Sequence, residues 1–282
     1  MTNASDIATL PRGAMEYRMQ GEGPCVLLVH GGHSSCEETF GLHALLAGGF
    51  SVLTPSRPGY GRTPATTGPS AETTADATAE LLDELGIERV HVVGVSAGGP
   101  SALHFVARHP ERVEKLVLAS AVTRLWYAPG DEMHATMQRV FGRWEQWTWR
   151  MMRTIATLAP RRHARMILEP LTTQDIDQVM AQLSANDVRE LQRMTRRQSS
   201  GRGFLLDLEH RVEPRVLDGV RAPTLVVHSR SDGSVGFAHA EHAVEHTAEA
   251  ELVEAPTLSH LLWIGSGQAQ VDTAVVGFLR GP

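Results

Sequence analysis

Cysteine, lysine and long apolar runs are scarce in this 282-residue sequence. The two cysteines, Cys25 and Cys36, are too few for a disulfide framework or a four-thiolate zinc site, so we expect two free thiols. No apolar run approaches the ~18 residues that a membrane helix needs. The chain begins with MTNASDIATLPRGA, which lacks the basic start and apolar stretch of a signal peptide. We therefore expect a soluble cytoplasmic protein with no membrane partner.

An excess of positive charge is also absent. Lys115 is the only lysine, and 26 basic against 32 acidic residues leave a net charge of −6. Binding to nucleic acid in general needs a basic footprint that displaces phosphate counterions, so we expect no nucleic-acid partner. The hydrophobic share of 42% suffices for a folded core and excludes a mainly disordered chain. A homodimer is one assembly that the composition leaves open.

Short apolar runs alternate with helical patterns over most of the chain. The predicted strands span residues 25–30, 50–54, 90–95, 113–119, 222–228 and 250–254. The predicted helices span residues 37–47, 71–86, 97–109, 237–247 and 268–279. Strands and helices in this order are typical of βαβ units, so the predicted fold class is α/β with a parallel sheet.

The alternation of strands and helices is interrupted in the second third of the chain. Residues 124–215 show arginine-rich helical patterns and no convincing strand pattern. We interpret this stretch as a helical cap inserted after the strand at 113–119, with residues 1–123 and 216–282 forming the α/β core. The cap holds fifteen arginines and eleven acidic residues, so its net charge is +4 and the remainder carries −10.

Residues 94–98 form the pattern Gly-x-Ser-x-Gly. It stands where the predicted strand 90–95 turns directly into a helix, which is the setting of a nucleophile elbow. Ser96 must adopt a strained backbone there, and side chains at positions 94 and 98 would collide with the neighbouring turn. The pattern predicts Ser96 as a nucleophile, with a non-catalytic turn of small residues as the alternative.

A serine nucleophile needs a base, and that base needs an acid to orient it. Among fourteen histidines, His260 stands out because it lies in a loop between the last predicted strand and the last helix. Asp232 follows the strand 222–228, so both side chains reach the carboxyl edge of the sheet. Ser96, Asp232 and His260 have the chain order of an α/β-hydrolase triad. A surface histidine and a turn-forming aspartate are the alternatives.

The other histidines are assigned structural positions. His30, His91 and His228 fall within or at the ends of strands, where a buried or sheet-edge role is expected. Three more, namely His239, His242 and His246, are expected on the exposed face of the helix 237–247.

Two backbone N–H groups are needed to hold the oxyanion of a tetrahedral intermediate. Ala97, directly after the nucleophile and at a helix N-terminus, is expected to supply one. The Gly-Gly pair after the strand 25–30 is expected to supply the other, from Gly32 in the first place and His33 in the second. A Gly-Gly turn without this role would look the same in the sequence.

These motifs together resemble the α/β-hydrolase-fold serine hydrolases of the capped esterase and lactonase type. The resemblance runs over residues 14–280 outside the insertion, and besides the elbow, Asp232 and His260 it rests on His30-Gly31-Gly32, Arg57-Pro58-Gly59-Tyr60-Gly61 and Ala222-Pro223-Thr224-Leu225. It implies a mostly parallel eight-stranded sheet flanked by helices, with a mobile cap. Ser96 at the elbow, rather than an aspartate, argues against a dehalogenase or an epoxide hydrolase. One departure is Ser229-Arg230, where relatives often carry a glycine before the acid.

Four of the five tryptophans lie in the predicted cap, namely Trp126, Trp144, Trp147 and Trp149. One interpretation is an aromatic lid over an apolar pocket, with Trp126 and His33 contacting the substrate and arginines attracting an anionic end. The other is a solvated basic face whose tryptophans form the core of the lid, and this second interpretation is the one the sequence favours.

The expected reaction is hydrolysis of a small-molecule carboxylic ester or lactone through an acyl-enzyme on Ser96. Neither a metal nor an organic cofactor is expected. The same triad serves C–C bond hydrolysis, and cofactor-free perhydrolysis or haloperoxidation, and these alternatives stay open. A different class is a hydrolase-fold receptor that binds a ligand and signals to a partner.

Overall fold

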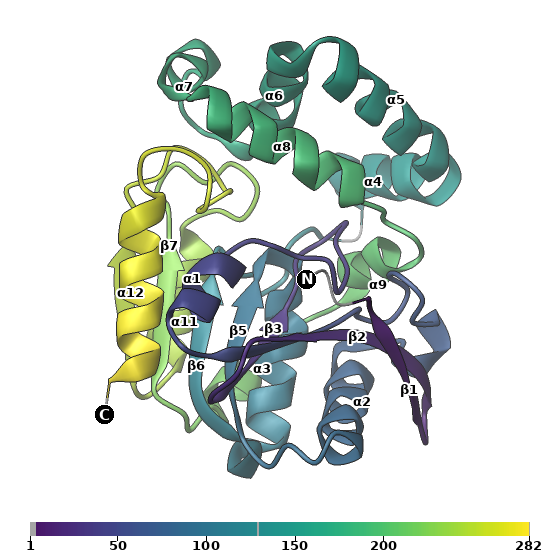
Figure 1. The fold of residues 1–282 in the computed structure, drawn as a ribbon, viewed down its shortest axis with the longest axis vertical. Coiled ribbons are helices and arrows are strands. Elements are labelled where there is room, and N and C mark those ends of the chain that lie inside the picture. The colour runs from purple at the N-terminus through teal and green to yellow at the C-terminus, as the bar shows by residue number, and fades with distance from the viewer. Residues whose placement is uncertain (1–3, 129, 282) are drawn as a thin grey trace.

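The computed structural model describes residues 4–128 and 130–281, and an eight-stranded sheet lies at its centre (Figure 1). The strands are β1 (Asp6–Leu10), β2 (Gly13–Gln20), β3 (Cys25–Val29), β4 (Ser51–Pro55), β5 (Val90–Val95), β6 (Val113–Ala119), β7 (Thr224–His228) and β8 (Ala250–Glu254). Their spatial order is β1-β2-β4-β3-β5-β6-β7-β8. β2 is antiparallel to β1 and β4, while the other neighbours are parallel. The predicted α/β fold with a mostly parallel eight-stranded sheet is confirmed.

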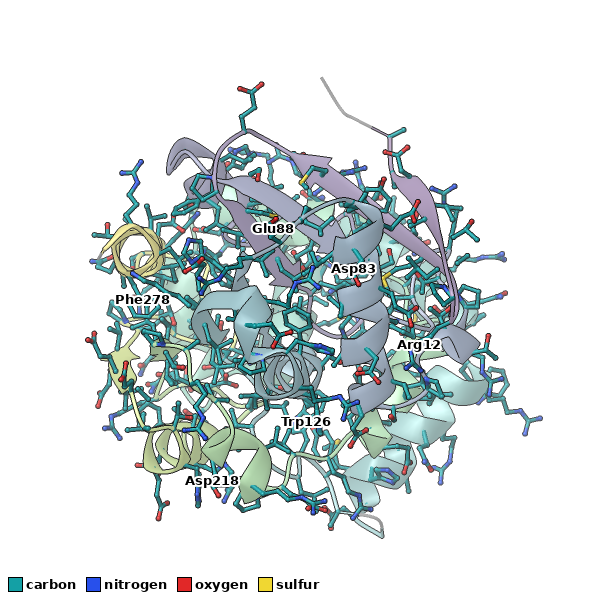
Figure 2. All side chains as sticks on the ribbon, turned by 90° about the horizontal axis from the view of Figure 1, so that it is seen from below. Arg12, Asp83, Glu88, Trp126, Asp218 and Phe278 are labelled. Carbon is teal, nitrogen blue, oxygen red and sulfur yellow. The ribbon has the colours of Figure 1, made fainter. Side chains whose placement is uncertain are left out.

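Helices cover both faces of the sheet. One face carries α2 (Ala71–Glu84), α3 (Gly99–Arg108), α10 (Pro214–Asp218) and α11 (Ala238–His246), and the other carries α1 (Leu42–Ala47) and α12 (Gln268–Arg280). Seen from below, Phe278 of α12 lies at the left side of the body, and Asp83 of α2 lies apart from it, nearer the middle (Figure 2). Because both faces are covered, the central strands are near-continuous runs of valine and leucine, which is why the sequence revealed them.

Local signals set the ends of α2. The Ser70 hydroxyl accepts the N–H of Thr73, and the Thr73 hydroxyl accepts the N–H of Ser70, so both N-terminal donors are satisfied. At the other end, Gly86 has a φ of +64°, a conformation that a side chain would disfavour. The helix therefore ends close to the predicted stop.

The hairpin formed by β1 and β2 was not predicted. Most side chains on its two strands are exposed or half-buried, so they give little of the apolar signal that reveals a strand. Glu16 anchors β2, because its carboxylate accepts bonds from Arg62 Nε at 2.8 Å, Ser56 Oγ at 2.8 Å and Ser5 Oγ at 2.9 Å. Burial alone would raise the pKa of Glu16, but these bonds and the Arg62 N–H lower it to about 2.

The predicted helix at 37–47 is too long at its N-terminal end, because α1 begins only at Leu42. The Glu38 carboxylate accepts the backbone N–H groups of Thr39 and Phe40, which holds this stretch in a turn. Gly41 then adopts a φ of +73°, which no helix interior allows. The helix starts after this left-handed residue.

The insertion between β6 and β7 is helical and lies above the sheet in Figure 1. Its helices are α4 (Glu132–Arg143), α5 (Glu145–Leu158), α6 (Pro160–Leu168), α7 (Ile176–Gln182), α8 (Ala185–Arg197) and α9 (Gly203–Glu209). Helices α6, α7 and α8 share an apolar cluster that includes Leu168, Val179 and Leu191, and Ile264 from the loop after β8 also belongs to it. The division into a core and a separate cap domain at 124–215 stays a prediction. No helix within residues 4–128 and 130–281 is both long and apolar enough to cross a membrane.

Candidate active site

Ser96 stands at a sharp turn between β5 and α3, in the 3₁₀ turn η2 (Ser96–Gly98). Its φ is +50°, a conformation that a residue with a side chain rarely adopts. A Cβ at Gly94 would lie 2.7 Å from the Cβ of Ala102, and one at Gly98 would lie 2.4 Å from the carbonyl oxygen of Val29. Close packing therefore requires both glycines. Gly94 packs against α3, and Gly98 packs against the end of β3.

Ser96, His260 and Asp232 lie in one hydrogen-bonded chain. His260 Nε2 is 2.8 Å from Ser96 Oγ, and His260 Nδ1 is 2.7 Å from Asp232 Oδ2. A carboxylate accepts only, so Nδ1 carries the proton and Nε2 is free to accept one from the serine. His260 and Asp232 are buried, which shields this chain from water.

The surroundings of Asp232 keep it ionised. Its Oδ1 accepts the backbone N–H groups of Ser234 at 2.9 Å and Val235 at 2.8 Å. The Nε2 of His228 lies 3.3 Å from Oδ2 and 2.7 Å from the carbonyl oxygen of Val235. Burial would raise the pKa of Asp232, but His260 and His228 hold it well below its ordinary value. The sequence had assigned His228 only a structural position at its strand.

Ser229 takes the place where relatives often carry a glycine, and its hydroxyl completes the turn. Ser229 Oγ donates to the carbonyl oxygen of Thr257 at 2.5 Å and accepts the N–H of Ser231 at 3.1 Å. These bonds tie the loop after β7 to the loop after β8. The turn before Asp232 therefore forms without the glycine.

The Gly-Gly loop after β3 approaches the elbow closely. A Cβ built on Gly31 would lie 3.2 Å from the Cβ of Ser96, and one on Gly32 would lie 3.7 Å from the Cβ of Ala97. Ala97 is in the first turn of η2, where backbone N–H groups have no acceptor within the helix. The structure thus brings together the Gly32 and Ala97 backbones, and their role as oxyanion donors stays a prediction.

Arg57 stabilises the Gly-Gly loop after β3 through hydrogen bonds to its carbonyl groups. Its Nε donates to the carbonyl oxygen of His30 at 2.8 Å and one terminal nitrogen donates to that of Gly31 at 3.2 Å. The guanidinium also forms a two-pronged ion pair with the buried Asp207 of α9, and Tyr60 donates its hydroxyl to the same carboxylate at 2.5 Å. The ion pair joins the core to the insertion. Loop 57–61 contributed to the resemblance, but no sequence signal identified Asp207 as its partner.

His30 is a neutral structural histidine. Its Nδ1–H donates to the carbonyl oxygen of Gly31 at 2.7 Å, and its Nε2 accepts the backbone N–H of Arg57 at 3.0 Å. Burial and the nearby Arg57 charge lower its pKa to about 3. The predicted structural role fits this geometry, since both ring nitrogens already have partners.

Four aromatic side chains of the insertion, which we call the aromatic wall, stand beside the Gly-Gly loop: Trp126, Phe141, Trp149 and Phe204. The His33 ring packs against three of them, with ring centroids 4.0 Å from Phe204 and 4.4 Å from Phe141. A Cβ on Gly32 would lie 3.1 Å from the Phe204 ring. Burial lowers the pKa of His33 to about 3, so this wall is apolar and uncharged.

Hydrogen bonds at both ends fix the aromatic wall. Trp126 Nε1 donates to the carbonyl oxygen of Ser234 at 2.9 Å, next to the Asp232 loop. Trp149 Nε1 donates to Ser200 Oγ at 2.8 Å, and the same hydroxyl lies 2.8 Å from His33 Nδ1. Trp144 and Trp147 are instead exposed, so neither interpretation of the tryptophans holds for all four.

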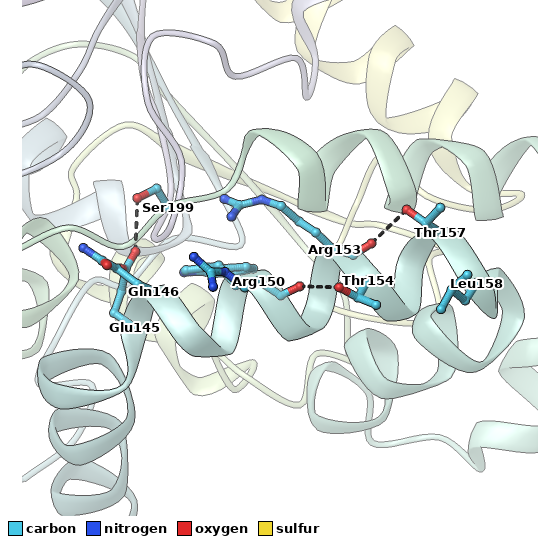
Figure 3. A pocket seen from close by; sticks show the side chains of 9 residues that line it. Glu145, Gln146, Arg150, Arg153, Thr154, Thr157, Leu158 and Ser199 are labelled. Carbon is cyan, nitrogen blue, oxygen red and sulfur yellow. Dashed lines mark hydrogen bonds between the residues drawn. The ribbon is translucent and has the colours of Figure 1, made fainter.

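Arginines of the insertion line an outer groove. A groove of about 610 Å³ runs along α5 and is lined in part by Arg150, Arg153 and Trp149 (Figure 3). None of its lining residues belongs to the Ser96–His260–Asp232 chain. Arg153 donates to the carbonyl oxygen of Gln198 at 2.6 Å.

The prediction that His239 lies on the exposed face of α11 is wrong. This side chain is buried, and its Nδ1 accepts the N–H of Thr123 at 3.1 Å. Burial and the charge of Arg124 lower its pKa to about 3. His242 and His246 are half-buried rather than exposed, and α11 packs against β7, β8 and α10.

Two free thiols, and a site without a metal, were expected. Cys25 and Cys36 are free thiols, and burial raises the pKa of each. In residues 4–128 and 130–281, no three His, Cys, Asp or Glu side chains gather closely enough to hold a metal ion. The expectation of a reaction without metal or cofactor stays a prediction.

Known proteins resemble this chain along its whole length. The profile of the alpha/beta hydrolase fold family matches residues 24–264. The uncharacterized hydrolase YcgS of Bacillus subtilis (strain 168) is 37% identical over 283 residues, covering 99% of this chain and 100% of that protein. An alpha/beta hydrolase fold protein from Nakamurella multipartita has a TM-score of 0.83 at 26% identity, covering 98% of this chain and 99% of that chain.

A partial match adds one relative with a named substrate. The 2-hydroxy-6-oxo-6-phenylhexa-2,4-dienoate hydrolase of Comamonas testosteroni is 32% identical over 110 residues, which cover 37% of this chain and 38% of that protein. The family assignment rests on the longer matches, since the profile spans residues 24–264 and YcgS aligns over 99% of the chain. This chain therefore belongs to the alpha/beta hydrolase fold family.

Proposed function

We propose that this protein is a serine hydrolase that cleaves an uncharged carboxylic ester or lactone. The chain Ser96–His260–Asp232, with links of 2.8 and 2.7 Å, carries the proposal. His260 Nε2 accepts the Ser96 proton while Oγ attacks the carbonyl carbon of the substrate. Asp232 holds the tautomer with a proton on Nδ1 and stabilises the imidazolium that forms.

The backbone N–H groups of Gly32 and Ala97 stabilise the tetrahedral oxyanion, because they are preorganised donors in a site shielded from water. The intermediate collapses when His260 gives its proton to the departing alkoxide, which leaves as an alcohol or, for a lactone, stays tethered to the acyl group. A water molecule then loses a proton to His260 and attacks the acyl carbon. Release of the acid returns the proton to Ser96.

The aromatic wall supports an apolar substrate group. Phe204 packs directly on Gly32, so a substrate whose carbonyl oxygen lies at the Gly32 N–H has an apolar surface beside it. His33 is neutral and adds no charge. Pockets of this kind bind alkyl or aryl groups and use a few polar donors for orientation.

A C–C bond hydrolase is the second candidate, because of the similarity to the dienoate hydrolase of Comamonas testosteroni. The substrate in that protein's name carries a carboxylate, which a free arginine or lysine would hold best. Arg57, beside the Gly-Gly loop, is already paired with Asp207. Arg150 and Arg153 face the outer groove. None of these three arginines is thus free beside Ser96, which favours the uncharged ester or lactone.

Steady-state turnover of the wild-type protein tests the proposal. The panel consists of p-nitrophenyl esters of graded acyl length, simple lactones and a 6-oxo-dienoate. We expect multiple turnovers on at least one ester or lactone, with kcat/KM at least ~10-fold above that for the dienoate. Faster turnover of the dienoate would make the C–C bond hydrolase correct. Labelling of Ser96 by a fluorophosphonate with no turnover on any substrate would favour a ligand-binding receptor.

Replacing Trp126 by alanine is expected to change the acyl-length preference. Trp126 packs edge-to-face on Phe204 at 6.1 Å between centroids, so its removal takes away part of the apolar surface that we propose the acyl group contacts. The ratio of kcat/KM between long and short acyl esters should shift by ~10-fold, the scale of one or two methylenes in an apolar pocket. Trp147→Ala is the matched control, because Trp147 is 61% exposed and its profile should match the wild type. A wild-type profile for Trp126→Ala would show that Trp126 does not contact the substrate.

A further inference from the structure

One short segment of the insertion contacts both loops that carry His260 and Asp232. Residues 171–173, at and after the 3₁₀ turn η4 (Glu169–Leu171), are called the cap clamp below. The carbonyl oxygen of Leu171 accepts the backbone N–H of His260 at 2.8 Å and that of Gly233 at 3.2 Å. A single carbonyl of the insertion thus holds the main chain of the candidate base and of the residue after the candidate acid.

Thr172 and Thr173 extend this contact. Thr172 forms a β-bridge with Asp232, and its hydroxyl donates to the carbonyl oxygen of Leu258 at 2.5 Å. The N–H of Thr173 donates to the carbonyl oxygen of Ser231 at 3.0 Å. The cap clamp therefore has two bonds to each loop, from main chain and side chain together.

Gly233 allows this close approach. A Cβ at position 233 would lie 2.8 Å from the backbone N, C and O of Thr172, which is closer than real Cβ atoms come. The φ of Gly233 lies outside the left-handed region, so its backbone conformation would suit a residue with a side chain. The close packing against Thr172 is therefore what requires a glycine here.

The His260 loop needs an external support of this kind. Residues 255–267 form no helix or strand; the loop is tied to the loop after β7 at Thr257, but no strand pairing holds the main chain of His260 itself. Catalytic geometry has to be held within about 0.5 Å, and a side chain on a loop reaches that precision only if its main chain is fixed. The bond from His260 N–H to Leu171 supplies this fixed point.

We propose that the cap clamp positions His260 relative to Asp232, with Thr172 as a positioning residue that acts through the two loops. This proposal rests on the proposed hydrolase function of the same site. It implies that the insertion contributes to the alignment of the triad as well as to the pocket. Movement of the insertion away from the sheet edge would release both loops together.

Gly233→Ala tests the proposal against a matched control, Gly236→Ala. Both glycines are exposed and lie in the same loop, but a Cβ at Gly236 would meet no atom within 4 Å. We expect Gly233→Ala to lower kcat by ~10²-fold with KM within about threefold, because a displacement of about 1 Å costs that much. The acid limb of the kcat/KM profile should move to lower pH, since a weaker Asp232 contact stabilises the imidazolium less. Gly236→Ala should stay within about twofold of wild type.

Thr172→Val and Thr172→Ser separate positioning from folding. The valine variant loses the bond to Leu258 and should lower kcat by ~10-fold with the same shift of the acid limb, while serine keeps the hydroxyl and should restore both. The proposal would be overturned if both Gly233→Ala and Thr172→Val had the wild-type kcat and pH profile. A lower Tm in these variants with an unchanged kcat and pH profile would overturn it as well.

The rate of Ser96 labelling by a fluorophosphonate gives a readout that does not need a substrate. If the wild type hydrolyses nothing in the panel, the proposed function fails, and this rate still compares Gly233→Ala with Gly236→Ala. Slower labelling of the first variant alone supports the positioning role. Equal labelling rates contradict it.

Discussion

Replacing Ser96 by alanine is expected to lower kcat by at least ~10³-fold while the protein folds normally. The hydroxyl oxygen is the atom that forms the acyl-enzyme, so its removal leaves only the oxyanion donors and binding to accelerate the reaction. Alanine carries a Cβ as serine does, so the φ of +50° is equally strained in the variant, and its Tm should stay close to that of the wild type. Steady-state kinetics on the best ester of the panel, together with a Tm measurement, checks both expectations.

Two histidine variants, His260→Ala and His242→Ala, provide the comparison for Ser96→Ala. His260→Ala should cost about as much as Ser96→Ala, because nucleophile and base act as a unit. His242→Ala, on the half-buried side of α11, should retain activity. His239→Ala is a poor control, since its ring is buried against Thr123 and its loss would disturb packing. Activity of Ser96→Ala within tenfold of wild type would show that another residue is the nucleophile.

Replacing Asp232 by asparagine is expected to lower kcat by ~10³–10⁴-fold. The two backbone N–H groups of Ser234 and Val235 can only donate, so they favour the amide oxygen at the Oδ1 position. The amide NH2 then faces His260 Nδ1, which must accept a hydrogen bond. The proton moves to Nε2, where the imidazole can no longer take the proton of Ser96.

Raising the pH separates this explanation from simple unfolding. The Asp232→Asn variant should keep a Tm within a few degrees of wild type, because the amide has nearly the volume of the carboxylate and its oxygen keeps the two bonds at the Oδ1 position. Its activity should rise with pH above the range in which the wild type is constant, since hydroxide can replace the base. A variant with kcat within tenfold of wild type would instead mean that another group, with His228 the nearest candidate at 3.3 Å, orients the imidazole.

Patterns that depend on close neighbours in the chain were readable before the fold was known. The covered strands β3, β5, β6 and β7 are runs of valine and leucine, and the elbow glycines at 94 and 98 lie beside the serine they serve. Asp232 and His260 could be chosen because each follows a strand whose carboxyl end faces the same edge. The parallel sheet brings such loop residues together whatever their separation in sequence.

Expectations failed where a neighbour distant in sequence decided the outcome. The β1–β2 hairpin carries little apolar signal, and its Glu16 depends on Arg62, 46 residues away. The helix expected from residue 37 starts at Leu42, because Gly41 takes a left-handed conformation. His239 was assigned to an exposed face, but α11 turns it toward Thr123.

The sequence alone determined a parallel α/β sheet and the candidate triad, because strands, the elbow motif and the loops after strands follow from local patterns, and the resemblance of its motifs to known hydrolases pointed to the family. The tertiary structure alone decided which groups support the site: the Arg57–Asp207 pair spans 150 residues, and the bond from His260 to the Leu171 carbonyl joins the insertion to the core. Salt bridges and backbone hydrogen bonds of this kind depend on where two distant segments dock. An isolated sequence pattern carries no information about that docking, because any nearby carboxylate or carbonyl group could satisfy the same donor.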